Sequence, residues 1–177
     1  MSALACREPR EADLADKTVG HLSDLINRVY DAAESGMWKR SGVRTSPDNV
    51  RELLKNKQLI LAELDDEIVG SVNVNLLDDA VAEFGMLVAD PDRRGLGIGS
   101  MLVHAAEEWA RSMNRRTMRL ELLTPRSWSH PSKEFLKAWY SRIGYVPQFT
   151  EPLEKTHPEL VRELATDCDF TVWHKQL

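Results

Sequence analysis

Cysteine is scarce in this chain, and the two cysteines that it has lie far apart. Cys6 and Cys168 stand near opposite ends of the 177 residues, with no CxxC pair and no cluster of histidines beside them. Small disulfide frameworks and structural zinc sites need several closely spaced ligands, so the sequence argues against both classes. We therefore expect two reduced thiols and no bound metal.

Long apolar runs and an excess of positive charge are also missing. No apolar run approaches the roughly 18 residues that a membrane-spanning helix needs. The first residues show no basic start followed by the apolar stretch of a secretory signal. The formal net charge is −5, whereas nucleic-acid binding requires a positive surface. We expect a cytoplasmic protein whose partner is neither a membrane nor a nucleic acid.

What the chain does contain is the composition of a globular domain. Hydrophobic residues make up 42% of it and charged residues 29%, and we find no internal repeat, low-complexity tract or linker. A chain of this length suits one hydrophobic core of ordinary size. We therefore predict a single domain over residues 1–177.

The first third of the chain carries two helical patterns separated by a loop. Apolar residues recur at helical spacing within residues 11–33, which predicts a helix over this range. Residues 34–45 break the pattern and are expected to form a loop. Ser46 and Pro47 then supply the N-cap and the first-turn proline of a second helix.

Extended and helical patterns alternate through the middle of the chain. Three apolar, β-rich runs predict an antiparallel meander over residues 58–64, 67–77 and 80–90. A glycine-rich loop follows, and then a helix that ends near residue 114. The predicted apolar stripe of this helix consists of Ile98, Met101, Leu102, Ala105, Trp109 and Met113.

The last third predicts a strand over residues 117–124, a helix over 131–143, and two final strands over 145–149 and 168–177. Gly144 stands where that helix should stop. Residues 158–164, between the final strands, favour a short helix. The inward side chains predicted for the helix at 131–143 are Phe135, Leu136, Trp139 and Ile143.

The order of these elements predicts the fold class. A short first strand, two helices, three strands, a helix, a strand, a helix and two strands describe an α/β (α+β) protein. We expect a mixed, mostly antiparallel sheet of about six or seven strands, with about four helices packed on both of its faces.

The glycine-rich loop has the form R-x-x-G-x-G, read from Arg94 to Gly99. A dinucleotide fingerprint, GxGxxG, fails because its last position falls on Ser100 or Leu102. A P-loop fails because the chain contains no Gly-Lys pair. Glycines before a helix still allow close backbone approach, and the helix amino terminus favours an anion. The pattern therefore indicates a pyrophosphate site of another kind.

Two segments resemble a known family. The run GMLVADPDRRGLGIGSMLVHAAEEWA, residues 85–110, resembles motif A of the GNAT superfamily of acyl-CoA-dependent N-acyltransferases. The run FLKAWYSRIGYVP, residues 135–147, resembles motif B of the same superfamily. The order of predicted strands and helices matches this fold over most of the chain. The family often has a cofactor-contacting asparagine seven residues before the motif-B tyrosine, where this chain has Lys133.

The resemblance implies acetyl-CoA, or another acyl-CoA, as the acyl donor, with no metal. The pyrophosphate would lie on the backbone amides of the glycine loop, and the pantetheine arm would run along the preceding strand as an added strand. The residues expected to bind the donor are Met86, Leu87, Val88, Arg93, Arg94, Gly95, Leu96, Gly97, Ile98, Gly99 and Ser100.

The chemistry requires a base for the amine and an acid for the thiolate. Tyr140 matches the motif-B tyrosine and is the expected acid; the alternative is an aromatic that only packs between Leu136 and Ile143. Glu83 lies inside an otherwise apolar strand and is the expected base. The alternative for Glu83 is a surface or ion-paired carboxylate.

The acceptor pocket is expected between two loops. The first loop carries Met37, Trp38 and Arg44. The second loop follows the strand at 117–124 and carries Arg126, Trp128 and His130. In superfamily members the loop between the first two helices commonly shapes this pocket. The alternative is that these aromatic residues cap the core.

Together these features predict an N-acetyltransferase in which an amine attacks acetyl-CoA directly. Two alternatives stay open: an enzyme that uses a longer acyl-CoA, and a CoA-binding regulatory module without turnover. The acceptor is an amine on a small molecule or a peptide, and the sequence does not identify it. The sequence also leaves open whether the chain forms a homodimer.

Overall fold

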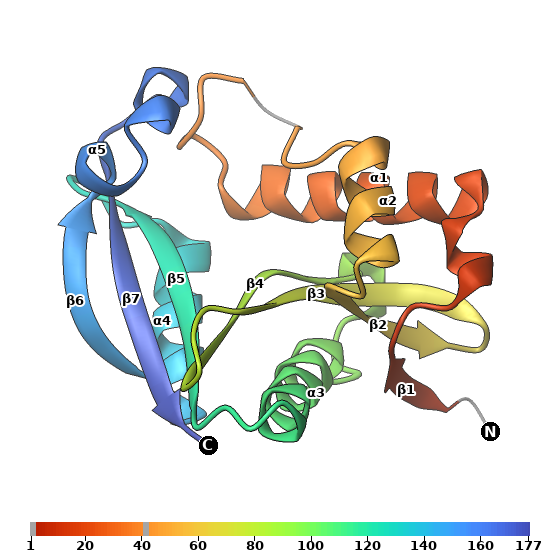
Figure 1. Cartoon of the computed structure of the whole chain (residues 1–177). Coiled ribbons are helices and arrows are strands. Elements are labelled where there is room, and N and C mark those ends of the chain that lie inside the picture. The colour runs from red at the N-terminus through yellow and green to blue at the C-terminus, as the bar shows by residue number, and fades with distance from the viewer. Residues whose placement is uncertain (1–2, 41–42) are drawn as a thin grey trace.

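A mixed sheet of seven strands forms the centre of the fold, with the strand order β1-β2-β3-β4-β5-β7-β6 (Figure 1). The computed structural model describes residues 3–40 and 43–177. Neighbouring strands are antiparallel except for β4 and β5, which confirms the predicted sheet. The strands are β1 (Leu4–Arg7), β2 (Leu59–Leu64), β3 (Glu67–Leu76), β4 (Val81–Ala89), β5 (Thr117–Pro125), β6 (Val146–Pro152) and β7 (Cys168–Gln176).

Helices cover both faces of the sheet, as the element order predicts. They are α1 (Asp16–Ala33), α2 (Pro47–Lys55), α3 (Ile98–Ser112), α4 (Pro131–Arg142) and the short α5 (Leu153–Thr156), with 3-10 turns at Glu11–Leu14, Pro91–Arg93 and Pro158–Glu163. Strand β2 shows how the faces divide. Ile60 and Ala62 belong to the core under α3 and α4, whereas Leu59 and Leu61 belong to the core under α1 and α2.

The first predicted helix is interrupted. A 3-10 turn over Glu11–Leu14 precedes α1, and Ala15 between them is extended, with φ −60° and ψ 140°. The Asp13 carboxylate explains the break, because it accepts a hydrogen bond from the Arg10 amide at 2.6 Å and pairs with Arg7 of β1 at 2.7 Å. The second helix begins as predicted, with the Ser46 hydroxyl accepting the Asn49 amide. Within the predicted loop at 34–45, residues 41–42 lie outside the described residues.

Two inward-facing predictions are wrong. Phe135 is 63% exposed, because the buried face of α4 is centred on Lys133 and Tyr140, and Phe135 points away from it. Met113 is 41% exposed, because α3 has already ended and Met113 is its C-cap. The buried stripe of α3 consists instead of Ile98, Leu102, Val103, Ala106, Glu107 and Ala110.

Strand β4 contains a bulge that reshapes the sheet. Ser71 and Asn73 of β3 are two steps apart, whereas their partners Val88 and Gly85 on β4 are three steps apart. The extra residue lies around Met86, whose φ is +47°. On the other side of β4, pairing with β5 stops at Glu83. Beyond that point the two strands diverge, and the sheet is split (Figure 1).

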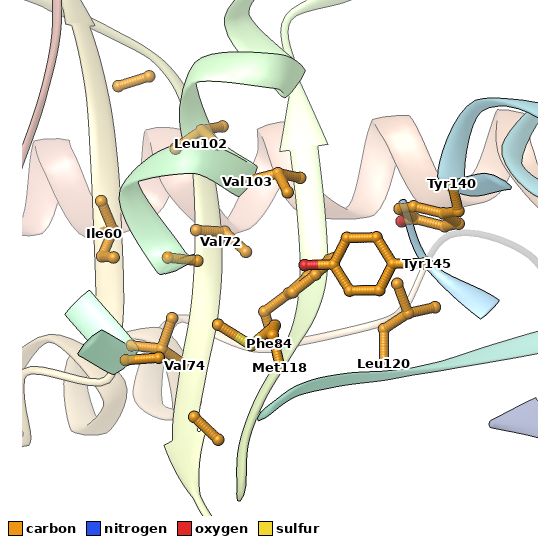
Figure 2. Close-up of a cluster of buried hydrophobic side chains, with 14 of the residues drawn as sticks. Ile60, Val72, Val74, Phe84, Leu102, Val103, Met118, Leu120, Tyr140 and Tyr145 are labelled. Carbon is orange, nitrogen blue, oxygen red and sulfur yellow. The ribbon is translucent and has the colours of Figure 1, made fainter. Parts of the chain in front are cut away.

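Aromatic rings anchor α4 beside the split. Phe84 of β4 lies 6.1 Å from the ring of Tyr140 and 5.8 Å from the ring of Tyr145 (Figure 2). The Tyr145 hydroxyl donates a hydrogen bond to buried Glu107 at 2.9 Å, and Lys175 neutralises the same carboxylate. The ring contacts hold Tyr140 next to β4, and the bonds to Glu107 tie the chain after α4 to α3 and β7.

Candidate active site

A cavity of about 430 Å³ lies at the split between β4 and β5. Its walls come from both strands, from α1 and α2 on one face of the sheet, and from α4 on the other. The bulge in β4 and the early end of its pairing with β5 explain why the cavity has lining residues from both faces. Among the predicted site residues, those that line it are Trp38, Arg44, Glu83, Met86, Leu87 and Tyr140.

Tyr140 reaches this cavity from the buried face of α4. Its side chain is 5% exposed and packs between Trp139, Phe84 and Tyr145, with ring centroids 5.1 to 6.1 Å apart. Burial raises the pKa of the Tyr140 hydroxyl above its usual value of 10. The phenol carries its proton at neutral pH, as any tyrosine does, and is a weaker acid than a free tyrosine, so it can donate a hydrogen bond to whatever occupies the cavity.

Glu83 lies at the closed end of the split, where β4 still pairs with β5. Its register partner on β5 is Arg119, and the Arg119 guanidinium is ion-paired with the Glu83 carboxylate. The same guanidinium contacts Glu121 at 2.5 Å. Glu83 and Glu121 both line the cavity, so two carboxylates share one arginine at its wall.

The glycine loop connects the end of β4 to the start of α3. Gly95 and Gly97 have φ values of +82° and +74°, a region that favours glycine, and Gly97 is the N-cap of α3. The first helical hydrogen bond runs from the Met101 amide to the Gly97 carbonyl at 3.0 Å. The amides of residues 98–100 precede that bond, so they are free of helical partners and can donate to an anion.

Ion pairs and a close approach fix this loop on the sheet. Arg28 of α1 contacts Asp90 at 2.8 Å and Asp92 at 2.9 Å, and Arg93 contacts Glu67 at 2.8 Å. Ile98 is buried over Gly70 of β3, where an added Cβ would stand 2.8 Å from the Ile98 side chain. Loop residues Arg94 to Gly97 and Ser100 are exposed, whereas Gly99 is half-buried.

The strand before the loop presents an open edge to the split. Met86 and Leu87 line the cavity, and in the described ranges β4 has no partner on β5 beyond Glu83. An extended ligand can use such an edge as an added strand. Val88 differs from its neighbours, because its side chain is buried against α1 and α2.

The predicted acceptor residues separate into two groups. Trp38 and Arg44 line the cavity, and Trp38 donates its indole N–H to Glu34 at 2.6 Å. Met37 is fully buried in a small core cluster that includes Leu123.

The second loop lies outside the cavity lining. Arg126 is engaged by Asp169 and Glu154, and Trp128 donates to Thr166 at 3.1 Å. His130 caps α4 by accepting the Ser132 amide, and its other ring nitrogen lies 3.1 Å from the Ser35 carbonyl.

Sequence patterns did not identify several residues of the cavity wall. Glu34 ends α1, and its carboxylate pairs with Lys133 of α4 at 2.8 Å, with both side chains buried. Tyr30 of α1 and Leu160 of the last 3-10 turn line the same cavity. A signal existed for Lys133, because a lysine on the buried face of an amphipathic helix needs a partner.

Two further properties of the described chain are plain. None of its helices is both long enough and apolar enough to cross a membrane. Within residues 3–40 and 43–177, no group of three or more histidine, cysteine, aspartate or glutamate side chains is arranged to hold a metal ion.

Solved structures share this fold over nearly the whole chain. A GNAT family acetyltransferase from Elizabethkingia anophelis, with acetyl-CoA bound, aligns with a TM-score of 0.66 at 15% identity, covering 98% of each chain. A ribosomal-protein-alanine N-acetyltransferase from Brucella melitensis aligns with a TM-score of 0.68 at 18% identity, covering 98% of this chain and 99% of that one.

A third structure is N-acetylglutamate synthase from Neisseria gonorrhoeae, complexed with coenzyme A and N-acetyl-glutamate. It aligns with a TM-score of 0.66 at 14% identity, covering 99% of this chain, which spans 35% of that protein. No curated protein matches the chain by sequence. The model of the acetyltransferase (GNAT) family, however, matches residues 23–140, and the chain therefore belongs to that family.

Proposed function

We propose that the protein is an N-acetyltransferase that moves an acetyl group from acetyl-CoA to an amine. The observation that carries the proposal is the position of one cavity. The cavity lies at the split between β4 and β5, its wall contains Tyr140 and Glu83, and its β4 side leads directly into the glycine loop. A phenol, a carboxylate and the glycine loop thus lie along one path, which supports the proposal.

The donor is proposed to follow that path. Its pyrophosphate accepts hydrogen bonds from the amides at the start of α3 that lack helical partners, where the helix dipole also favours negative charge. Its pantetheine arm lies along the open edge at Met86 and Leu87, as an added strand. The thioester then reaches the cavity beside Tyr140.

The reaction is proposed to be a direct attack. The acceptor enters as an ammonium ion and must lose a proton, which Glu83 takes directly or through a water molecule. The amine nitrogen then forms a bond to the thioester carbonyl carbon, the nitrogen loses its second proton to water, and the carbon–sulfur bond breaks. Tyr140 gives its proton to the leaving sulfur and regains one from solvent. The products are the acetylated amine, CoA as the free thiol and one proton.

The ion pair with Arg119 fits a positioning function for Glu83. A carboxylate that is free to rotate would spend little time facing the incoming ammonium, whereas the guanidinium fixes one oxygen, Oε2, in place. The other oxygen, Oε1, remains available for the proton. We therefore propose that Arg119 orients the base.

Acyl length is a separate part of the proposal. Leu120, Leu122 and Leu136 give the cavity an apolar wall, which suits the methyl group of acetyl and also longer chains. Competition between acetyl-CoA and longer acyl-CoAs, measured by calorimetry, tests this part. Tighter binding and faster turnover with acetyl-CoA support the proposal, and the opposite order identifies an enzyme for a longer acyl group.

The test of the proposed function is a turnover screen. Release of CoA thiol from acetyl-CoA is followed against a panel of amines that includes amino acids, polyamines, aminoglycosides and peptides with free amino termini, and each product is identified by mass. Amine-dependent thiol release with an acetylated product supports the proposal. Tight binding of acetyl-CoA without acetylation of any amine identifies a binding module and overturns it.

A further inference from the structure

A second cavity, of about 640 Å³, adjoins the first. Tyr30, Glu34, Trp38, Arg44 and Leu160 line both cavities, so these residues form the junction between them. The second cavity is built mainly from the end of α1 and the loop that follows, far along the chain from the glycine loop. An acceptor that enters through it passes the junction before it reaches Tyr140 and Glu83.

Arg44 stands at this junction on a fixed piece of backbone. The Asn27 side chain accepts hydrogen bonds from the Arg44 amide at 2.7 Å and the Thr45 amide at 2.9 Å, and it donates to the Thr45 carbonyl at 3.0 Å. The Arg44 guanidinium lies 4.6 Å from the centroid of the Tyr30 ring. No carboxylate of the described residues forms an ion pair with it, so its charge is positioned but not neutralised.

The other cations of the first cavity are already engaged. Lys133 lines the cavity and pairs with Glu34, whereas Arg119 lies outside the lining and is shared by two lining carboxylates, Glu83 and Glu121. One guanidinium facing two carboxylates leaves an excess of negative charge at the strands. The first cavity is therefore negative near the closed end of the split and positive at the junction.

The charged side chains of the second cavity do not reverse this distribution of charge. Its remaining charged side chains are Asp31, Arg40 and Glu163. Asp31 and Arg40 have opposite charges, and Glu163 lies 3.6 Å from Arg162. These groups are exposed, as Arg44 also is, so water screens all four charges. What distinguishes Arg44 is its place, because among the described residues it is the one lysine or arginine that lines both cavities.

We infer that the acceptor carries a carboxylate as well as an amine, as an amino acid does, and that Arg44 determines this specificity by pairing with the carboxylate. The inference rests on the proposed function and names the substrate class of the same site. A guanidinium binds a carboxylate through two parallel hydrogen bonds, which fixes both its position and its orientation. The ammonium group of the same molecule is then directed toward Glu83 and Glu121.

The experiment uses sets of three acceptors that share one side chain. Each set contains an L-amino acid, its amide and the amine left after decarboxylation. Turnover is measured with acetyl-CoA, and binding to the CoA-saturated protein is measured by calorimetry, which does not depend on catalysis. A charge-assisted pair of this kind is worth about 1.5–3 kcal/mol, so the best amino acid should exceed its amide by about ten- to a hundredfold in both measurements.

Three variants separate the role of Arg44 from general effects. Arg44→Gln should bring the ratio between amino acid and amide close to one, chiefly by raising KM for the amino acid. Arg44→Lys retains the positive charge but not the two parallel N–H donors of the guanidinium, so it should keep part of the preference for the amino acid over its amide. Arg116→Gln is the matched control, because Arg116 is exposed and lies at the other end of β5 from the cavity, and its ratio should equal that of the unchanged protein.

Each contrary outcome has a distinct meaning. If amides or decarboxylated amines are acetylated as well as the amino acids, or if Arg44→Gln keeps the preference, the inference is wrong while the proposed function stands. If no amine of any class is acetylated although acetyl-CoA binds, the proposed function is wrong, and the inference is wrong with it.

Discussion

Tyr140 has the aromatic packing that one sequence alternative predicted and the cavity position that the other, the proposed acid, requires. The residue is packed among aromatic rings, as a core residue would be, and it also lines the cavity at the split. Burial raises the pKa of the hydroxyl and makes it a weaker acid than a free tyrosine, so the proposed proton transfer depends on its fixed position beside the leaving sulfur. A rigid, protonated phenol beside a thioester is what the proposed acid requires.

Replacing Tyr140 by phenylalanine tests this role. Tyr140→Phe keeps the ring and its packing but removes the proton, so kcat should fall by about a hundredfold or more. The affinity for acetyl-CoA should not change. Steady-state kinetics and calorimetry measure the two quantities, and a variant with unchanged kcat would remove Tyr140 from the proposed mechanism.

Tyr145→Phe is the matched control for Tyr140→Phe. Tyr145 belongs to the same aromatic cluster, but it does not line the cavity, and its hydroxyl is bonded to Glu107. Loss of that buried bond should lower the free energy of unfolding by about 1–3 kcal/mol, measured by urea denaturation, while kcat stays near its original value.

The partners of some individual side chains could not be predicted from the sequence. Glu83 is ion-paired, as the alternative reading of its position in an apolar strand allowed, but the partner, Arg119, follows from the register of two strands. A register between β4 and β5 cannot be derived from either strand alone. Likewise, Glu34 and Lys133 meet across 99 positions in sequence, which no local pattern reveals.

At the scale of elements, the junction between β4 and α3 is the part that sequence predicted best. Glycine spacing, the strand before it and the helix after it are local features, and the structure places the loop where they indicated. The bulge at Met86 could not be predicted in this way. Tertiary packing imposes the positive φ of this non-glycine residue, so the sequence around Met86 does not predict it.

Gly97→Asp tests the glycine loop as an anion site. An added Cβ at Gly97 meets no atom within 4 Å, and aspartate tolerates a positive φ better than most residues, so the fold should persist. The new carboxylate would oppose the pyrophosphate, and the Kd for CoA should rise by about a hundredfold or more.

Gly97→Asn is the control for the loop. Asparagine has nearly the same shape and backbone preference as aspartate but no charge, so its effect on CoA binding should be clearly smaller. Calorimetry with CoA compares the two variants. Tight binding of CoA by Gly97→Asp would contradict the use of this loop for the pyrophosphate.

The pairing of β5 with β7 predicts a dependence of stability on pH. His174 of β7 stands opposite Arg119, and burial, together with that positive charge, lowers the pKa of His174 below its ordinary value of 6.5. The unfolded chain therefore binds a proton at a higher pH than the folded chain does. This contribution to stability is complete above pH 6.5 and is lost as the pH falls through the lowered pKa.

Glutamine does not titrate, so His174→Gln should remove the part of the stability loss at low pH that His174 causes. Urea denaturation at a series of pH values on both sides of 6.5 measures it. The variant should lose less stability than the original protein as the pH falls. Parallel curves for the two proteins would show that His174 does not contribute.

At the scale of the whole molecule, the two cores on opposite faces of the sheet define where chemistry can occur. Helices α1 and α2 are held by one core and α3 and α4 by the other, and the cavity lies where the sheet between them is split. The order of elements predicted this arrangement of layers, because each element has to bury its apolar face. The order alone does not determine the split, which depends on a bulge and on where one parallel pairing stops.

The central claim is that an amine takes the acetyl group directly from acetyl-CoA within this split. The most direct test is a single turnover with acetyl-CoA labelled in its acetyl group, mixed with an excess of protein and an acceptor from the screen and stopped at successive times. We expect the label to pass from CoA to the amine, with no labelled protein at any time. Label that accumulates on the protein before it reaches the amine, or that never leaves CoA, would contradict it.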